Sequence, residues 1–169
     1  MSRLVPTGEM TLGPFFPREF AQGANDLTVV EGKKAQGEAI EITGRVTQLD
    51  GAALDNVVLE IWQAGADGRY DNPDFFGWGR AATGADGVFL FRTILPKGPQ
   101  GRQPHVNFIV LYSGLMRALH TAMFFEDSDD PVLNSVQEKS RLIARKTGPH
   151  SYRFDIRLRG EGETPFFDD

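Results

Sequence analysis

Apolar and polar residues alternate along several short stretches of the chain, which is the pattern of β-strands with one buried face. The clearest alternation sets Val57, Leu59 and Ile61 on one face of a strand, and Tyr152, Phe154, Ile156 and Leu158 on one face of another. Phe89 and Phe91 alternate with Val88, Leu90 and Arg92 in a third strand, which is expected to be covered on both sides. Further strands are expected around Ile42 and Val46, in PHVNFIVLY (104–112) and in ALHTAMFFED (118–127). Because Gly, Pro and Asp turns separate these short strands, the chain is predicted to be all-β, an antiparallel β-sandwich.

One stretch has a helical pattern instead. SVQEKSRLIARK (135–146) starts with Ser135 and has Glu138 three residues later, as in a capping box, and Leu142 and Ile143 give it an apolar edge. We therefore predict one peripheral helix there.

The first 39 residues have little periodicity and interleave Gly, Pro and Asn. Such a segment has no core of its own and must lie on another surface. Residues 1–39 are therefore predicted to be an extended N-terminal arm that contributes contacts to a partner, and residues 40–169 to be the β-sandwich domain.

Composition narrows the possible functions. A chain of 169 residues fits one domain, and 18 Lys+Arg against 23 Asp+Glu, scattered along the chain, leave no basic stripe for nucleic acid. The absence of cysteine excludes disulfides, iron–sulfur clusters and thiol nucleophiles. MSRLVPTGEM lacks the apolar core of a signal peptide, and no apolar run reaches the roughly 18 residues of a membrane span. A cytoplasmic protein without membrane or nucleic-acid partners is expected.

Histidine and tyrosine are the best candidates for chemistry, because no nucleophile elbow, paired carboxylates or phosphate-binding glycine loop is evident. Ferric iron is well served by phenolate and imidazole ligands, and Tyr70, His105, Tyr112 and His120 could supply them. In QPHVNF, His105 and Asn107 are two residues apart and so face the same side of a strand, but only one carries an imidazole. Taken singly, a histidine on a strand is more often a hydrogen-bonded structural residue than a metal ligand.

Four stretches, in their order along the chain, resemble the intradiol ring-cleaving dioxygenases: LEIWQAGADGRYDNP, FGWGRAATGADGVFLFRTILPKGP, PHVNF and YRFDIRLRGEGETPFFDD. The resemblance implies a β-sandwich whose ferric ion is held by two tyrosinates and two histidines. Tyr70 matches the first tyrosine and His105 the first histidine, whereas Asn107 stands at the second histidine position and LPKGPQGRQ has no tyrosine for the second. Two ligands are thus missing, and this chain is expected to have no catalytic residue and no metal, with Tyr70, His105 and Asn107 as vestigial positions.

The segments TLGPF, LHTAMFFED and DPVLNS are similar to those of the iron-free α chain in a two-chain enzyme of this family. That similarity implies a homologous β subunit that binds Fe(III), a higher αβ hetero-oligomer, and an aromatic acid, protocatechuate, that is opened with O2 to 3-carboxy-cis,cis-muconate. It also implies substrate-pocket roles for Thr11, Gly13 and Pro14 of the arm and for Ser113, which stands where the family has arginine. Arg117 is the nearest cation that could take over the charge.

Two other interpretations stay open at this point. One is a self-sufficient dioxygenase that uses Tyr70 and His105 with a rearranged pair from Tyr112 and His120. The other is a non-enzymatic binding module on the same sandwich, because a fold does not fix a function.

Overall fold

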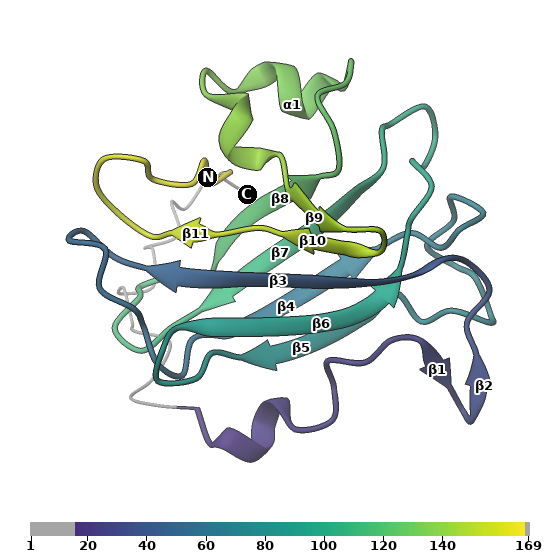
Figure 1. Ribbon diagram of the computed structural model, residues 1–169, viewed down its shortest axis with the longest axis horizontal. Helices are drawn as coiled ribbons and strands as arrows, with labels where there is room; N and C mark the ends of the chain where they lie inside the picture. The colour runs from purple at the N-terminus through teal and green to yellow at the C-terminus, as the bar shows by residue number, and fades with distance from the viewer. Residues whose placement is uncertain (1–15, 168–169) are drawn as a thin grey trace, which may run out of the picture.

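Two β-sheets packed face to face form the body of the protein, which a computed structural model describes over residues 16–167 (Figure 1). The first sheet is antiparallel throughout, in the order β5 (Trp78–Ala82), β4 (Val58–Gln63), β7 (His105–Leu111) and β8 (Leu119–Phe124). The second sheet contains β6 (Val88–Ile94), β3 (Ala39–Thr47), β10 (Ser151–Arg153), β11 (Ile156–Arg157) and β9 (Arg145–Gly148). The predicted all-β sandwich is confirmed.

The strand β3 holds the second sheet together. It pairs antiparallel with β6 on one side, and parallel with both β10 and β11 on the other. The chain crosses from β10 to β11 beside Gly44, where Phe154 donates its backbone N–H to the Thr43 carbonyl. The pairings of β10 and β11 with β3 are therefore parallel, whereas the other pairings in the two sheets are antiparallel.

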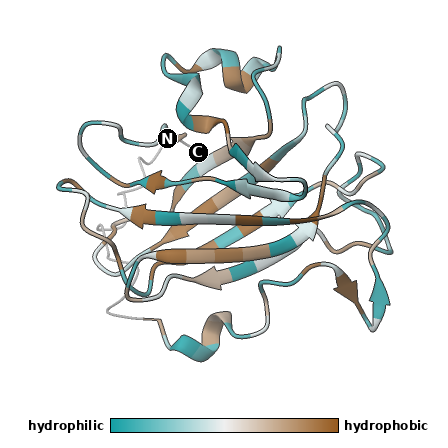
Figure 2. Ribbon diagram, viewed as in Figure 1, coloured by the Kyte–Doolittle hydropathy of each residue, from teal (hydrophilic) through white to brown (hydrophobic). Residues whose placement is uncertain are grey.

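The core lies between the sheets, where the apolar residues of the two inner faces meet. Val57, Leu59 and Ile61 are fully buried, and polar and apolar bands alternate along β3 and its neighbours (Figure 2). Phe89, Phe91 and Phe108 pack edge to face with ring centroids 6.0–6.1 Å apart. Such aromatic pairs add to the stabilisation that burial of their area provides.

The prediction of a helix at 135–146 is wrong in its position. The α-helix α1 spans Pro131–Ser135, Val136 is already extended at φ −99° and ψ 141°, and a separate 3-10 helix, η2, spans Lys139–Leu142. The cap is Asp130, whose carboxylate accepts the N–H groups of Val132 and Leu133, with proline at the first helical position. Leu142 is buried under this short helical region, as expected of an apolar edge residue.

Residues 16–39 lie along the sandwich of their own chain. They include the 3-10 helix η1 (Arg18–Ala21) and a small hairpin of β1 (Val29–Val30) and β2 (Lys33–Lys34). Leu27 is buried, and its N–H donates to the Arg92 carbonyl at the edge of β6. Contact between the arm and a partner stays a prediction, because residues 1–15 lie outside the described range. Among residues 16–167, no helix has the length and apolar character needed to cross a membrane.

Candidate functional site

Tyr70, His105 and Asn107 meet on the outer face of the first sheet. His105 opens β7 and Asn107 follows two residues later, so both side chains leave the strand on the side away from the core. Tyr70 comes from the loop between β4 and β5. Its hydroxyl lies 3.5 Å from Nε2 of His105 and accepts a hydrogen bond of 3.2 Å from Nδ2 of Asn107. The three positions expected from the resemblance are thus neighbours in space.

The hydrogen bonds give each of these groups a defined role. Nδ1 of His105 lies 2.7 Å from the Gln103 carbonyl, which can only accept, so Nδ1 carries the proton and Nε2 presents its lone pair to Tyr70. Burial, reinforced by the charge of Arg102, lowers the pKa of His105 below its usual value, despite the opposing bond to Gln103. At neutral pH His105 is therefore uncharged, and the hydrogen bonds run from Asn107 through Tyr70 to His105.

The Tyr70 ring also packs against the ring of Trp62. It stacks on Trp62 of β4 with centroids 5.9 Å apart and planes 5° from parallel. Nδ2 of Asn107 bonds to the Trp62 carbonyl at 3.1 Å, so the amide is tied to the sheet as well as to the tyrosine. Asn107 therefore has a structural role of its own in fixing Tyr70.

A buried ion pair orders the segment that leads into β7. Arg102 contacts Asp130 through Nε at 2.7 Å and Nη2 at 3.0 Å, and the Gln103 N–H donates to the same carboxylate at 3.0 Å. The Asp130 side chain is fully buried. Burial opposes its ionisation, but Arg102 and the N–H groups of Gln103, Leu133 and Val132 prevail and lower the pKa of Asp130 to about 2.

Sequence reasoning did not identify Asp130. A signal was present, because an Asp directly before Pro and an apolar pair is a helix N-terminus signature. The bidentate pair with Arg102 could not be found in this way, since the two residues are separated by 28 positions and two strands.

An open hollow of about 750 Å³ lies beside Tyr70 and His105. Arg69, Tyr70, Pro99, Arg102 and His105 are among the residues that line it. Arg69 forms an exposed pair with Asp71, with Nε 2.9 Å from Oδ1. The hollow is therefore lined by charges of both signs.

These residues do not fit a ferric ion. The lone pair of His105 that would bind a metal faces the hydroxyl of Tyr70, and Asn107 offers that oxygen a hydrogen bond instead of offering the metal an imidazole. Residues 95–104 contain no tyrosine, and the charged group that they place here is the Arg102 guanidinium, which repels cations. Within residues 16–167, His, Cys, Asp and Glu side chains form no group of three that could hold a metal.

The other candidate residues lie elsewhere. His120 belongs to β8 opposite Ile109, four residues from His105 along β7, or about 13 Å at the usual strand rise. Tyr112 lies farther still, just past the end of β7, and packs against the core. The structure therefore does not bring these two together with Tyr70 and His105.

The predicted substrate-pocket residues lie at the opposite end of β7 from the trio, as far as they are described. Ser113, partly buried, and Arg117, exposed, are both in the loop that joins β7 to β8. Thr11, Gly13 and Pro14 lie outside the described residues. Their pocket roles stay predictions.

Known proteins give the family of this chain. The sequence matches the family Dioxygenase_C, described as Dioxygenase, over residues 11–160. It is 30% identical to the protocatechuate 3,4-dioxygenase alpha chain of Burkholderia cepacia, over 99% of this chain and 100% of that one. It is 36% identical to the alpha chain of Pseudomonas putida, over 79% and 78%, and 34% identical to the beta chain of Burkholderia cepacia, over 83% and 74%.

Solved structures agree in fold. The dioxygenase domain of a carbohydrate-binding fusion protein from Streptomyces sp. SirexAA-E superposes with a TM-score of 0.63 at 27% identity, over 92% of this chain and 99% of that one. A 3-chlorocatechol 1,2-dioxygenase from Rhodococcus opacus 1CP, at 24% identity and a TM-score of 0.61, shares the fold over 89% of this chain and 72% of its own. With its sandwich, its Tyr70–His105 pairing and these relatives, the chain belongs to the intradiol ring-cleavage dioxygenase family.

Proposed function

We propose that this chain is the α subunit of a protocatechuate 3,4-dioxygenase. It encloses the iron pocket of a homologous β subunit, which binds Fe(III) and opens protocatechuate with O2 to 3-carboxy-cis,cis-muconate in aromatic catabolism. The chain holds no catalytic iron itself; it shapes the substrate cavity and excludes water from it.

The hydrogen-bonded chain from Asn107 through Tyr70 to His105 is the observation on which this proposal rests. A trivalent ion needs anionic donors to offset its charge, and here a tyrosine hydroxyl is hydrogen-bonded between an amide and a neutral imidazole. Similarity over nearly the full length to a protocatechuate 3,4-dioxygenase alpha chain supports the assignment. A beta chain of such an enzyme is also related, at 34% identity.

The two ends of β7 would then have different tasks. The end with His105 is the former metal site, now closed by hydrogen bonds. The other end carries Ser113 and Arg117, which, together with Thr11, Gly13 and Pro14 of the arm, face the substrate in the partner's pocket. Glycine allows close approach to a flat ring, and a threonine hydroxyl can bond a polar group of the ligand.

The first experiment separates the α-subunit role from a self-sufficient dioxygenase. Purified by itself, the full chain is expected to bind iron far below one ion per chain and to lack the visible absorption of a tyrosinate–iron centre. Co-expressed with a homologue that has both tyrosines and both histidines, it is expected to co-purify and to give a coloured, protocatechuate-cleaving complex. As a control, replacing one iron ligand of that homologue should abolish both colour and activity.

Stoichiometric ferric iron and ring-opening activity in the isolated chain would refute the proposal. A stable monomer that captures no such homologue would instead favour a non-enzymatic binding module.

Arg117 gives a second prediction. If its guanidinium attracts the substrate carboxylate, Arg117→Ala in the assembled enzyme should raise the KM for protocatechuate by about tenfold, the value of one lost charge-assisted contact of roughly 1.5 kcal/mol, with a smaller effect on kcat. Steady-state kinetics at constant ionic strength measure this. Arg159→Ala, on the exposed loop after β11, is the control, and an unchanged KM for Arg117→Ala would exclude the role.

A further inference from the structure

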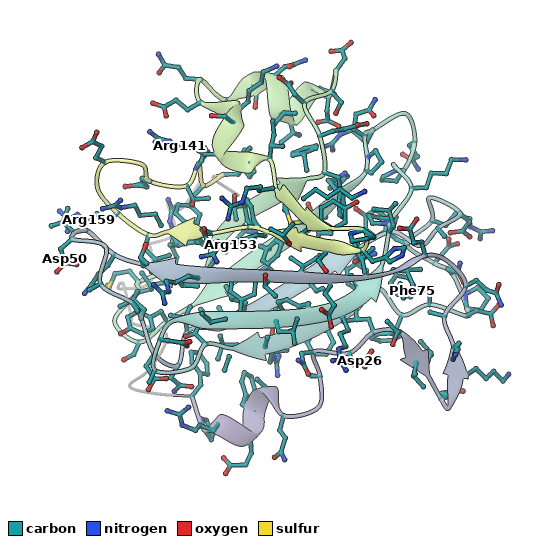
Figure 3. All side chains as sticks on the ribbon, in the orientation of Figure 1. Asp26, Asp50, Phe75, Arg141, Arg153 and Arg159 are labelled. Atoms are coloured by element: carbon teal, nitrogen blue, oxygen red, sulfur yellow. The ribbon has the colours of Figure 1, made fainter. Side chains whose placement is uncertain are left out.

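Three arginines surround a second, smaller hollow that shares no lining residue with the one at Tyr70. It has a volume of about 250 Å³ and lies between η2 and the strands β9 and β10. Arg141 comes from η2, Arg145 from β9 and Arg153 from β10. Figure 3 shows Arg141 beside the helical region and Arg153 on β10, whereas Arg159 lies farther out on the loop after β11.

Two of these arginines are directly opposite each other. In the antiparallel pair of β9 and β10, Arg145 and Arg153 are partners in the register. Their side chains therefore leave the sheet on the same face, and both line the hollow. Like charges in this position destabilise a sheet unless an anion lies between them.

The chain supplies only part of that negative charge. Nε of Arg153 bonds both oxygens of Asp155, at 3.0 and 2.9 Å, and the same carboxylate also accepts the Arg45 N–H at 2.9 Å. Arg141 pairs with Glu138 and donates to the Glu163 carbonyl at 3.1 Å. Arg145 has no ion pair with any residue in the described part of the chain.

We propose that this hollow binds a small oxyanion, a phosphate or carboxylate group, between Arg145 and Arg153. The guanidinium of Arg145 contributes the charge that the protein leaves uncompensated, and the planar forks of the arginines match the geometry of such oxygens. Ile143, which is partly buried, also lines the hollow. A volume of 250 Å³ admits the anionic group or a small molecule that carries it, and no large ligand.

Binding there would join η2 to the β9–β10 hairpin, which begins three residues after η2 ends. The anion site does not depend on the proposed subunit role. Failure of the anion-binding test would therefore leave the subunit role intact, and failure of the subunit role would leave the anion site intact.

The test uses the thermal midpoint of the full chain, in whatever assembly it purifies, at constant ionic strength. Inorganic phosphate is added against a sodium chloride reference, and succinate in a second series. At ten times the dissociation constant, a single site raises the midpoint by about 4 °C for a chain of this size. Arg145→Gln should lose this shift, and Arg159→Gln, a matched exposed arginine, should keep it.

The behaviour without phosphate separates binding from a merely structural role. Without phosphate, the thermal midpoint of Arg145→Gln should equal or exceed that of the wild type, because the substitution removes repulsion between Arg145 and Arg153. With phosphate, the wild type should have the higher midpoint. A shift with phosphate alone assigns a phosphate group, and one with succinate alone assigns a carboxylate. A response equal to that of chloride, an undiminished shift in Arg145→Gln, or a lower midpoint of that variant without phosphate would overturn the proposal.

Discussion

Asp130→Ala is expected to lower the free energy of unfolding by about 3 kcal/mol, from a lost helix cap of about 1 kcal/mol and a lost charge-assisted contact with the partly exposed Arg102 of about 2 kcal/mol. The Asp130 side chain is fully buried and accepts hydrogen bonds from Arg102 and from the N–H groups of Gln103, Val132 and Leu133. Its loss would leave a guanidinium without its counter-charge and α1 without its cap. Urea denaturation at pH 7, followed by tryptophan fluorescence, measures the difference.

The control for this variant is Asp127→Ala, which removes an exposed carboxylate paired with Lys139. Surface pairs of this kind contribute little, so a change below about 1 kcal/mol is expected. Equal effects of the two substitutions would show that Asp130 does not organise the region.

The stability that Asp130 provides should also depend on pH in a defined direction. Its folded pKa of about 2 lies below the ordinary value, so the unfolded chain takes up the proton first as the solution is acidified. The contribution is complete above about pH 4 and is lost as pH falls towards 2. The difference in stability between wild type and Asp130→Ala should therefore narrow over that range, and a constant difference would contradict the depressed pKa.

Gly44→Ala is the second variant with a large expected effect. A Cβ at this position would lie 1.8 Å from the Phe154 carbonyl oxygen and 2.6 Å from Cζ of Phe89. The carbonyl oxygen belongs to the backbone and the Phe89 ring is fully buried, so neither can move away without a large loss of stability. We expect a loss of about 4 kcal/mol or more, which is a large fraction of the roughly 5–15 kcal/mol that stabilises an ordinary domain. Soluble yield and the urea midpoint are the measurements.

Gly148→Ala is the matched control in the same sheet. There the nearest atom to an added Cβ is Cβ of Ser151 at 3.5 Å, an ordinary contact. Stability should change by about 0.5 kcal/mol or less. If Gly44→Ala were equally mild, the crossing of the chain from β10 to β11 beside Gly44 would have to be looser than described.

The strands could be predicted because their pattern is local. Alternation of period two in Val57, Leu59 and Ile61 follows directly from one face being buried, and the structure buries all three. The pairing of β10 and β11 with β3 in parallel could not be predicted, because it depends on contacts between residues more than 100 positions apart. Alternation shows which face is buried but not which strand is the neighbour.

The helix was misplaced because two signals competed. Ser135 and Glu138 have capping-box spacing, but Asp130 followed by Pro131 starts the helix earlier and with stronger hydrogen bonds. Val136 then turns to extended backbone, so the predicted start is in fact the end of the helix. Local spacing alone could not decide between these signals.

The candidate site was only partly accessible from sequence. That His105 and Asn107 share a face follows from their spacing, but Tyr70 was linked to them through resemblance to a family, since 35 residues separate it from His105. Arg102 was overlooked because a charged residue in a Gly/Pro-rich segment usually faces water. Its partner, Asp130, becomes visible only when the fold brings α1 beside the start of β7.

The position of β3 in the second sheet has a consequence for biosynthesis. Its register partners on one side, Ser151 to Arg153, are made more than 100 residues after Glu41 to Thr43. While the ribosome is still extending the chain, β3 has β6 on one side and an open edge on the other, and an open edge invites pairing with another molecule. Non-local closure of this kind is slow. Chaperones that shield nascent chains should therefore engage this protein until its last strands emerge.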